Sequence, residues 1–335
     1  MKKVSVIVAA YNAHDTLARC LGSLVNQTLE DIEIIVVNDA STDDTWEIMK
    51  RCKQQFTDKV VIINGEKNRG QGGAKNQGFD AATGEYIGIV DSDDYVASNM
   101  FELMYGEAKS KDADIVDCGI YFESTDGAEI TTGDNVIGTL DIEKRKILIL
   151  AGGYLTTKII RRELFNDPPV RMRENIKCLV DNDIIKYMIL RAKNIYNVKH
   201  VLYRYCDSKG SATKTLDLIP YYDSIYSVME SIYELCHKFP DYEILKETME
   251  YTLVNWYSHG VNRCLYDQIV RYGASIENIP QYFEDCPENI MDMLRKLTNL
   301  KKRIVTIDYR ENNEILNRIS DLDIRIMEEC DSFFA

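Results

Sequence analysis

Short apolar runs alternate with amphipathic segments through the first part of the chain, and this alternation restricts the fold more than any other feature. The apolar runs cover residues 4–8, 32–37, 60–63 and 86–90. Between them, apolar residues recur at helical spacing over residues 16–25 and 43–49. Strands that are apolar on both faces and separated by helices indicate a parallel sheet with helices on both sides. We therefore predict an α/β fold with a mostly parallel central sheet.

A polar segment follows each of the four predicted strands. These segments are Ala9-Ala10-Tyr11-Asn12, Asn38-Asp39-Ala40-Ser41, Asn68-Arg69-Gly70 and Asp91-Ser92-Asp93-Asp94. Ligands of such sheets bind at the carboxyl ends of the strands, so we expect all four segments to line one edge. Any one of them alone is explained by a helix cap or a turn. Their joint occurrence at successive strand ends indicates a nucleotide-binding crevice.

The fourth segment places three carboxylates within four residues. Two carboxylates about 5 Å apart repel by roughly 3 kcal/mol at an effective dielectric of about 20. A divalent ion relieves this repulsion, and Mg²⁺ or Mn²⁺ is usually held by one or two protein carboxylates together with substrate phosphates. A polar turn that caps the next helix explains the cluster, taken alone, equally well.

Composition excludes several classes of protein. The chain has 335 residues, enough for two or three compact units, and a formal charge of −14, which argues against a general nucleic-acid binder. It contains no apolar run of 18 or more residues, and its apolar start is too short for a secretory signal, so we expect a cytoplasmic protein. Nine scattered cysteines without a Cys-x-x-Cys pair fit buried, reduced thiols rather than a zinc site.

The pattern changes after the fourth strand. Strands are predicted over residues 115–122 and 195–205, a hairpin or loop over 124–133, and a helix over 183–193. Beyond residue 213 the chain reads as helical, with one short strand at 303–307. The predicted helices lie near residues 219–236, 242–257, 288–300 and 313–329.

Two features of the helical region have a functional and a plain explanation. Its tyrosines can stack on sugars, but core or partner-facing roles explain them more simply. They are Tyr221, Tyr222, Tyr226, Tyr233, Tyr242, Tyr251 and Tyr257. Residues 293–303 combine basic and apolar side chains, which fits contact with an anionic lipid surface or a solvated helix face. The region also offers a surface for an oligomer.

The ordered motifs resemble those of family 2 glycosyltransferases with the GT-A fold. The matching segments are residues 4–8 with Tyr11-Asn12, Asn26-Gln27-Thr28, residues 33–43, Asn68-Arg69-Gly70 with Ala74-Lys75-Asn76 and Gly78, and Asp91-Ser92-Asp93-Asp94. The resemblance is dense to about residue 97, weaker to about 213 and absent beyond. It implies a nucleotide-sugar-binding half at 1–97, an acceptor-binding half at 98–213 and a helical C-terminal region at 214–335.

The resemblance also implies roles for single residues. Tyr11 should pack near a uracil ring beside Ala9 and Asn12, and Asp39 should accept a hydrogen bond from the base or ribose. The wall near the diphosphate should consist of Asn68, Arg69, Gly70 and Lys75. Within the acidic motif, Asp93 is expected to bind Mn²⁺ or Mg²⁺ directly, while Asp91, beside Ser92, lies nearer the ribose or a metal-bound water. Asp94 is a weaker candidate.

Three positions depart mildly from the family pattern: Ala9 replaces Pro, Ala40 replaces Gly, and Lys75 replaces Arg, so that the bidentate fork of an arginine is missing. A larger departure concerns the catalytic base. The aspartate that acts as general base in the family corresponds to Asp181, with Asp183 as a rival. Val180 and Ile184 replace the usual Glu and aromatic residue. Both carboxylates would also suit the positive start of a helix without any catalytic role.

A loop later in the chain resembles one that closes over the donor. It comprises Tyr203-Arg204-Tyr205 and Lys209-Gly210-Ser211-Ala212-Thr213, where Gly210 would permit movement and a basic side chain would meet phosphate. An exposed loop leading into the helical region explains it equally well.

The resemblance implies an inverting displacement. A sugar would move from a UDP-sugar donor to the hydroxyl of a cell-surface glycan or a lipid-linked acceptor, with Asp181 taking the proton and a metal ion stabilising the departing diphosphate. Two alternatives are a non-catalytic nucleotide-sugar-binding or assembly protein, and a sugar nucleotidyltransferase. The sequence argues against a nucleotidyltransferase, because this chain has no Gly-rich, Lys-containing turn after the first strand. Ala9-Ala10-Tyr11-Asn12 stands there instead.

Overall fold

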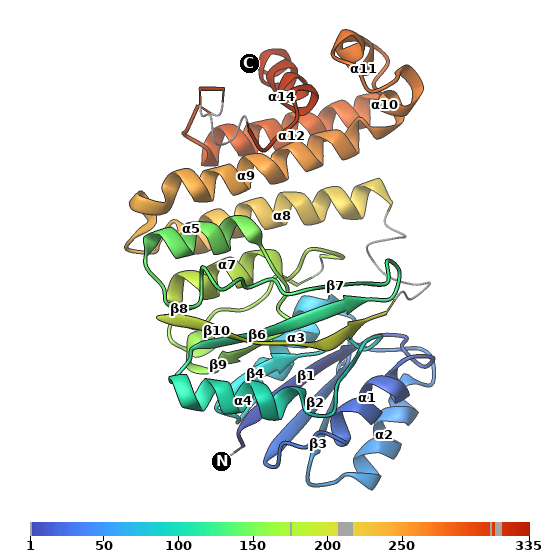
Figure 1. Cartoon of the computed structure of the whole chain (residues 1–335). Helices are drawn as coiled ribbons and strands as arrows, with labels where there is room; N and C mark the ends of the chain where they lie inside the picture. Colours follow the sequence, from blue (N-terminus) through green and yellow to red (C-terminus); the bar gives the residue numbers. More distant parts are fainter. Residues whose placement is uncertain (1, 175, 207–216, 309, 312–316) are drawn as a thin grey trace. The chain divides into compact units, whose positions relative to one another are not determined.

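The structure is a computed structural model of the whole chain, and it describes residues 2–174, 176–206, 217–308, 310–311 and 317–335. The chain divides into two compact units, Met1–Thr215 and Leu216–Ala335 (Figure 1).

The first unit is built on one sheet, which has ten strands among the described residues. The strands are β1 (Val4–Ala10), β2 (Ile32–Asn38), β3 (Val60–Asn64), β4 (Tyr86–Ile89), β5 (Tyr95–Val96), β6 (Ile115–Phe122), β7 (Gly127–Glu129), β8 (Gly138–Thr139), β9 (Lys158–Arg161) and β10 (Asn194–Tyr205). Their order is β3-β2-β1-β4-β9-β6-β10-β5, with β7 beside β6 and β8 beside β10.

Parallel pairing joins the long strands. β1 pairs in parallel with β2 and β4, β2 with β3, and β6 with β10. The register aligns Ala10 with Asn38 and Asn38 with Asn64, so the carboxyl ends of three strands meet at one edge. The mostly parallel sheet is therefore confirmed. The hairpin expected at 124–133 is also present, because β7 pairs antiparallel with β6.

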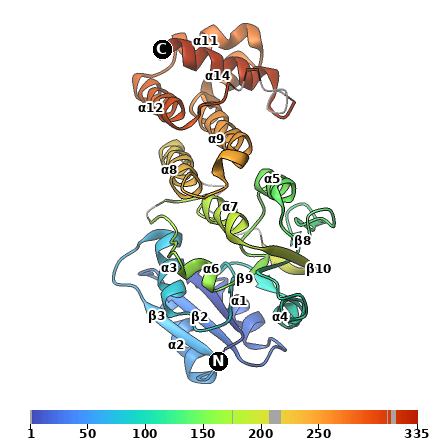
Figure 2. The same ribbon diagram turned by 90° about the vertical axis from the view of Figure 1, so that its left-hand side faces the viewer.

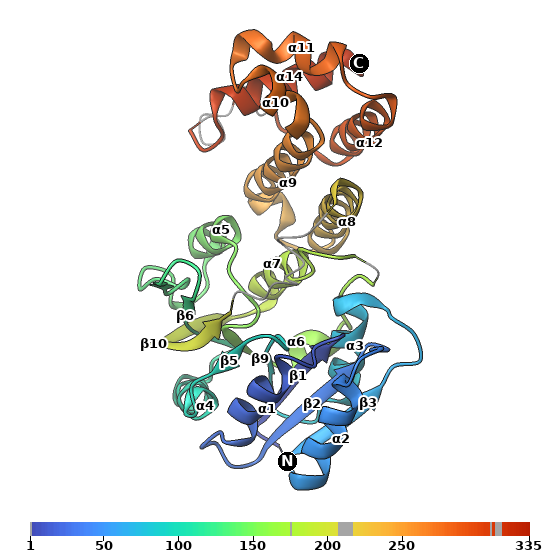
Figure 3. The same ribbon diagram turned by 90° about the vertical axis from the view of Figure 1, so that its right-hand side faces the viewer.

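Helices cover both faces of this sheet. They are α1 (Leu17–Val25), α2 (Thr45–Gln55), α3 (Gly70–Ala81), α4 (Met100–Lys111), α5 (Ile142–Ala151), α6 (Glu163–Asn166) and α7 (Asn182–Arg191). Val4, Val6 and Val8 of β1 share one buried core with residues of α1, α2 and α4. Ile7, between them, points to the other face and meets α3 at Gly78. Figures 2 and 3 show α3 on one side of the sheet and α1 and α4 on the other.

The second unit is helical in its described residues. It contains α8 (Leu218–Cys236), α9 (Tyr242–Cys264), α10 (Tyr266–Tyr272), the short 3₁₀ helix η1 (Ile276–Asn278), α11 (Ile279–Glu284), α12 (Glu288–Ile304) and α14 (Asp321–Phe333). The helical C-terminal region is therefore confirmed. None of the described helices is long and apolar enough to cross a membrane.

One predicted strand in this unit is wrong. Residues 303–307 do not pair with a sheet; α12 continues to Ile304, and the chain then turns away. Leu297, Leu300 and Ile304 continue one buried stripe at helical spacing, and this packing overrides the strand preference of the β-branched residues. Glu250 of α9 fixes the end of the segment by accepting a hydrogen bond from the backbone N–H of Ile307 at 2.7 Å.

Candidate functional site

The segments after β1 and β2 are tied together at the sheet edge. Asn12 Oδ1 accepts a hydrogen bond from the backbone N–H of Thr42 at 2.9 Å, and the Asn12 N–H donates to Ser41 Oγ at 3.0 Å. Asn12 and Ala40 both adopt left-handed conformations, with φ of 47° and 58°. Ala40 thus keeps the backbone geometry for which the family uses glycine.

Tyr11 and Asp39 occupy different environments within this edge. The Tyr11 side chain is 51% exposed, so its ring is open to a planar ligand, and Ala9 is half-buried behind it. Asp39 is buried, and its Oδ1 accepts a hydrogen bond from the backbone N–H of Arg69 at 2.8 Å. Burial raises the pKa of Asp39 against the lowering effect of its backbone donors.

The third segment leads into α3. Gly70 has a φ of 75°, a left-handed value that glycine accepts at no steric cost, and its N–H donates to Asn68 Oδ1 at 3.1 Å. Because Asp39 holds Arg69 from the other side, the end of β2 and the start of α3 form one connected wall.

The acidic motif lies at the end of β4. Asp91, Ser92 and Asp93 are half-buried, so part of each residue is exposed to solvent. Arg19 of α1 fixes the turn by donating from Nη2 to the backbone carbonyl of Asp93 at 2.7 Å. Gln71 of α3 donates from Nε2 to Asp91 Oδ1 at 3.3 Å.

Asp94 has a different environment from the other two carboxylates. It is buried, accepts from the Tyr203 hydroxyl at 2.6 Å and accepts from the Cys206 N–H at 2.8 Å. Burial, with Asp91 nearby, raises the pKa of Asp94 to about 8. These bonds fasten the acidic turn to the end of β10, which is a structural role.

Asp181 lies opposite the acidic motif. It precedes α7, and its side chain does not cap that helix. Instead, Asp181 Oδ1 lies 3.3 Å from Lys75 Nζ, and the same nitrogen lies 3.3 Å from Asp91 Oδ1. The Lys75 side chain is 0% exposed, whereas those of Asp91 and Asp181 are 25% and 24% exposed. The two carboxylates are therefore partly exposed to solvent, whereas the ammonium group that they contact is buried.

Electrostatics support a charged Lys75. Burial lowers its pKa, but Asp181 and Asp91 outweigh that effect, and the net pKa is raised. Burial raises the pKa of Asp181, while the ammonium of Lys75 lowers it, and the net direction is upward. Asp181 is therefore a stronger base than an ordinary surface aspartate.

Asp183 and the two departures from the family pattern lie in the interior. Asp183 is 3% exposed, and its Oδ1 accepts from the backbone N–H of Ile184 at 2.8 Å. Val180 and Ile184 are buried, so they contribute to the hydrophobic core rather than to the open side of the site. The structure brings Asp181 together with Asp91 at one lysine ammonium, whereas Asp183 lies in the interior.

The carboxylates of the acidic motif are the candidate ligands for a divalent ion. Among the described residues no three side chains of His, Cys, Asp or Glu gather around one point, so a cage made only of protein ligands is absent from that part of the chain. Two half-buried carboxylates on one turn match the usual site for Mg²⁺ or Mn²⁺, in which substrate phosphates complete the coordination. The residues present fit such an ion.

Gln71 contacts Asp91 but was not among the site residues predicted from the sequence. It lies one turn before Lys75 on α3, so both side chains project from the same face of the helix. This four-residue spacing from Lys75 is the sequence feature that could have identified Gln71.

The loop expected to close over the donor is described only in part, because residues 209–213 lie outside the described residues. Within its described part, Arg204 stacks over the ring of Tyr121 at 4.5 Å.

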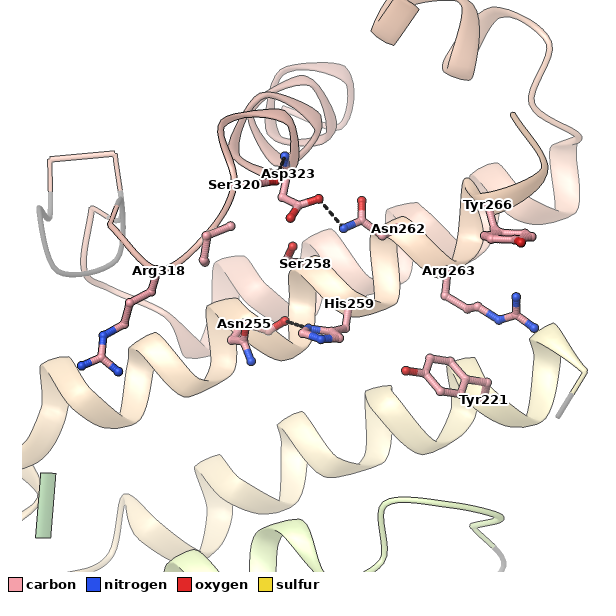
Figure 4. A pocket seen from close by; sticks show the side chains of 11 residues that line it. Tyr221, Asn255, Ser258, His259, Asn262, Arg263, Tyr266, Arg318, Ser320 and Asp323 are labelled. Atoms are coloured by element: carbon pink, nitrogen blue, oxygen red, sulfur yellow. Dashed lines mark hydrogen bonds between the residues drawn. The ribbon is translucent and has the colours of Figure 1, made fainter. Parts of the chain in front are cut away.

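A separate polar pocket of about 370 Å³ occurs in the second unit, along one face of α9 (Figure 4). Arg263 lies 5.9 Å from the ring of Tyr221 and 5.5 Å from that of Tyr266, and Asn262 donates to Asp323 of α14 at 2.6 Å. Tyr221 lines this pocket, so sugar stacking stays a prediction there. Tyr222, Tyr242 and Tyr257 are buried, as a core role requires.

The basic cluster at 293–303 is largely engaged within the second unit. Lys301 is buried and lies 2.6 Å from Asp331, Lys302 donates to the backbone of Phe334 at 2.9 Å, and Arg303 pairs with Glu230 at 3.3 Å. Arg295 pairs with Asp292. These contacts favour an intramolecular role, and the lipid contact stays a prediction.

Comparisons with known proteins agree with this architecture. The family model "Glycosyl transferase family 2" matches residues 5–167. Glycosyltransferase GlyG of Streptococcus pneumoniae serotype 4 is 34% identical over 224 residues, 63% of this chain and 73% of that protein. A poly(ribitol-phosphate) beta-glucosyltransferase of Bacillus spizizenii is 29% identical over 232 residues, 69% of this chain and 36% of that protein.

A solved structure resembles nearly the whole chain. S. aureus TarS 1–349 in complex with UDP-GlcNAc matches 99% of this chain and 91% of its own, with a TM-score of 0.64 and 19% identity. This likeness establishes the fold, which is of the GT-A type with a helical C-terminal region. The chain belongs to glycosyltransferase family 2 and is a glycosyltransferase. That result decides against a nucleotidyltransferase and against a purely non-catalytic binding protein.

Proposed function

We propose that this glycosyltransferase moves a sugar from a UDP-sugar to an acceptor hydroxyl with inversion, and that Asp181 is the general base. The observation that carries the proposal is that Asp181 and Asp91 both pair with the ammonium of Lys75, each at 3.3 Å. This shared contact supports a pairing of the candidate base with the acidic motif.

The donor would bind along the connected strand ends. Tyr11 would stack on the base with the Ala9 backbone alongside, Asp39 would accept from the base or ribose, and Asn12 would hold the loop in place. The path of the diphosphate would follow Asn68, Gly70 and the turn at Ser92. The UDP-GlcNAc complex of the TarS structure, which has the same fold, supports a uridine nucleotide as donor.

Asp181 would take the proton of the acceptor hydroxyl as it attacks, a role worth about 10²- to 10⁴-fold in rate. Its raised pKa suits this role, because a base gains proton affinity as its pKa rises toward the working pH. Asp183 would support the start of α7, since it is buried and bonded to its own backbone.

Asp93 and Asp91 would hold Mn²⁺ or Mg²⁺, which supplies positive charge to the departing diphosphate when it is bound. Arg19 keeps the backbone of Asp93 fixed, and Gln71 and Lys75 both hold Asp91 through Oδ1. Among the described residues, none donates a hydrogen bond to Asp91 Oδ2 in this arrangement.

Residues 1–97 would form the donor half, residues 98–213 the acceptor half, and residues 214–335 a helical region that binds the acceptor polymer or a second copy of the chain. The acceptor would be a cell-surface glycan or a lipid-linked saccharide. The poly(ribitol-phosphate) beta-glucosyltransferase relative supports a surface polymer as the acceptor class.

Peripheral contact with the inner face of a membrane would use exposed cations of 293–303, such as Lys296. Failure of wild type to float with anionic vesicles would exclude that contact.

The donor proposal is tested by thermal shift and by release of UDP. Wild type is incubated with UDP-glucose, UDP-galactose, UDP-GlcNAc and UDP-GalNAc, each with Mn²⁺ and with EDTA. We expect at least one donor to raise the melting temperature only with the ion, and Asp93→Ala to lose that shift while keeping its own stability. Equal shifts in EDTA, or in Asp93→Ala, would remove the metal role. No shift and no UDP release with any of the four would contradict a UDP-sugar donor.

A further inference from the structure

Lys75 is a buried cation between two carboxylates that come from distant parts of the chain. Asp91 ends β4 and Asp181 precedes α7, and each has an Oδ1 atom 3.3 Å from Lys75 Nζ. The Lys75 side chain has no exposed surface. Lys75 therefore links Asp91 to Asp181 from a buried position.

This placement differs from the expected contact with the diphosphate. An ammonium with no exposed surface cannot reach a phosphate unless it leaves its position between Asp91 and Asp181. Leaving would place an unpaired positive charge elsewhere and two uncompensated carboxylates near one another, and both changes are unfavourable. The geometry favours a lysine that stays in place.

The helix that carries Lys75 is fixed on both sides. Asn76 exchanges two hydrogen bonds with the backbone of Met172, at 2.8 and 2.9 Å. A Cβ atom at Gly72 would lie 2.2 Å from the carbonyl oxygen of Arg173, and one at Gly78 would lie 2.4 Å from the Ile7 side chain. Such close packing prevents α3 from sliding, so the position of the Lys75 backbone is set by the fold.

We propose that Lys75 is a positioning residue that holds Asp181 at a fixed distance from Asp91, and so aligns the base with the leaving-group side of the site. The proposal rests on the proposed function of Asp181. Lys75 engages Oδ1 of Asp181, and none of the described residues donates to Oδ2, which is the atom that would take the acceptor proton.

The chemistry of lysine suits this position. Its ammonium has three donors on one atom, so a single nitrogen serves both carboxylates and retains one donor. The planar fork of an arginine is larger and would have to fit into a site where Lys75 is already fully buried. The departure from the family's arginine therefore matches the space available here.

Steady-state kinetics of Lys75→Met test the proposal, because methionine approximates the shape of lysine without its charge. We expect kcat to fall by about 10- to 100-fold, since a misplacement of about 1 Å can cost that much. The KM for the UDP-sugar should change by less than about three-fold, because Asp91 keeps its hydrogen bond from Gln71 and Lys75 itself has no surface for the donor. Lys75→Arg should recover only part of the lost kcat, because it restores the charge but its larger guanidinium has to fit into a fully buried position.

Lys158→Met is the matched control. Lys158 is also a buried lysine of the first unit, and it pairs with Asp117 at 3.0 Å, but it makes no contact with Asp91 or Asp181. Its loss should lower the melting temperature and leave the kcat of the folded enzyme within about two-fold of wild type. The comparison separates a loss of stability from a loss of alignment, and Lys75→Arg remains informative if Lys75→Met does not fold.

Each outcome has a defined meaning. A kcat for Lys75→Met within two-fold of wild type would overturn the proposal, as would a rise in donor KM as large as the fall in kcat, which would show a phosphate contact. Both results leave Asp181 as the base. Full activity of Asp181→Asn would instead overturn the base assignment, and the role of Lys75 with it.

Discussion

At the scale of single residues, the site depends on how charge is distributed among aspartates that look alike in the sequence. Asp91 and Asp181 remain partly exposed beside a buried ammonium, whereas Asp94 and Asp183 are buried and bonded to the protein. The sequence identified the acidic motif and both candidate bases. It did not separate them, because the difference comes from contacts with Lys75, Tyr203 and backbone groups far away in the chain.

His14 offers a test of the electrostatics beside the candidate donor site. Its Nδ1 lies 2.8 Å from Asp43 Oδ2, and this hydrogen bond, with the nearby charge of Asp15, raises the pKa of His14 above 6.5. Protonated His14 therefore favours the folded state below the unfolded pKa, and that contribution is lost as the pH rises through the raised folded value.

An NMR titration of the His14 ring measures this pKa. The midpoint should lie above 6.5 in wild type and fall toward that value in Asp43→Asn, because the largest cause of the shift is removed. Asp15→Asn should lower the midpoint by less. An unchanged midpoint in Asp43→Asn would contradict the ion pair.

At the scale of secondary structure, hydrophobic periodicity and composition predicted the long helices and strands. Elements that are short or depend on tertiary contacts were not predicted. No strand was predicted at β9, because its four residues, Lys158–Arg161, are few and carry a charge at each end, yet they pair antiparallel between β4 and β6. The strand expected at 303–307 failed for the opposite reason, since buried helical packing at Ile304 outweighed β-branched composition.

The space around two helical glycines predicts opposite effects of alanine substitution on stability. Gly78→Ala would place a Cβ atom 2.4 Å from Ile7 Cγ2 and should destabilise the protein by about 1–3 kcal/mol. Gly106→Ala in α4 has open space around it and should stabilise by about 0.5–1 kcal/mol through helix propensity. Urea unfolding of both variants checks the signs, and a neutral Gly78→Ala would show that α3 is free to move.

At the scale of the whole molecule, two units share one chain, and the motifs that define the family lie in the first. The change from a strand pattern to helices was readable in the sequence, because the last long strand ends at Tyr205 and helices follow. The function of the second unit was not readable, since some of its tyrosines are buried and others line a polar pocket, and only tertiary packing separates them.

The nine cysteines test the packing of both units together. Seven are buried, and only Cys52 and Cys286 are partly exposed. Burial raises the pKa of Cys52 and raises that of Cys286 to about 11, so even these two should react slowly. Titration with a thiol reagent in the absence of reductant should show at most two reactive thiols in the native protein and nine after denaturation. Fewer than nine in denaturant would show a disulfide.

The most direct measurement is UDP release and product formation by wild type, Asp181→Asn and Asp183→Asn with the donor that stabilises the enzyme and an acceptor glycan. Asp181→Asn should bind the donor with unchanged affinity but lose at least about 10²-fold in kcat, the scale of general-base catalysis. Asp183→Asn should keep its kcat per folded molecule, with folding checked by thermal unfolding. Full turnover by Asp181→Asn, together with loss of turnover in a folded Asp183→Asn, would contradict the account and assign the base to Asp183.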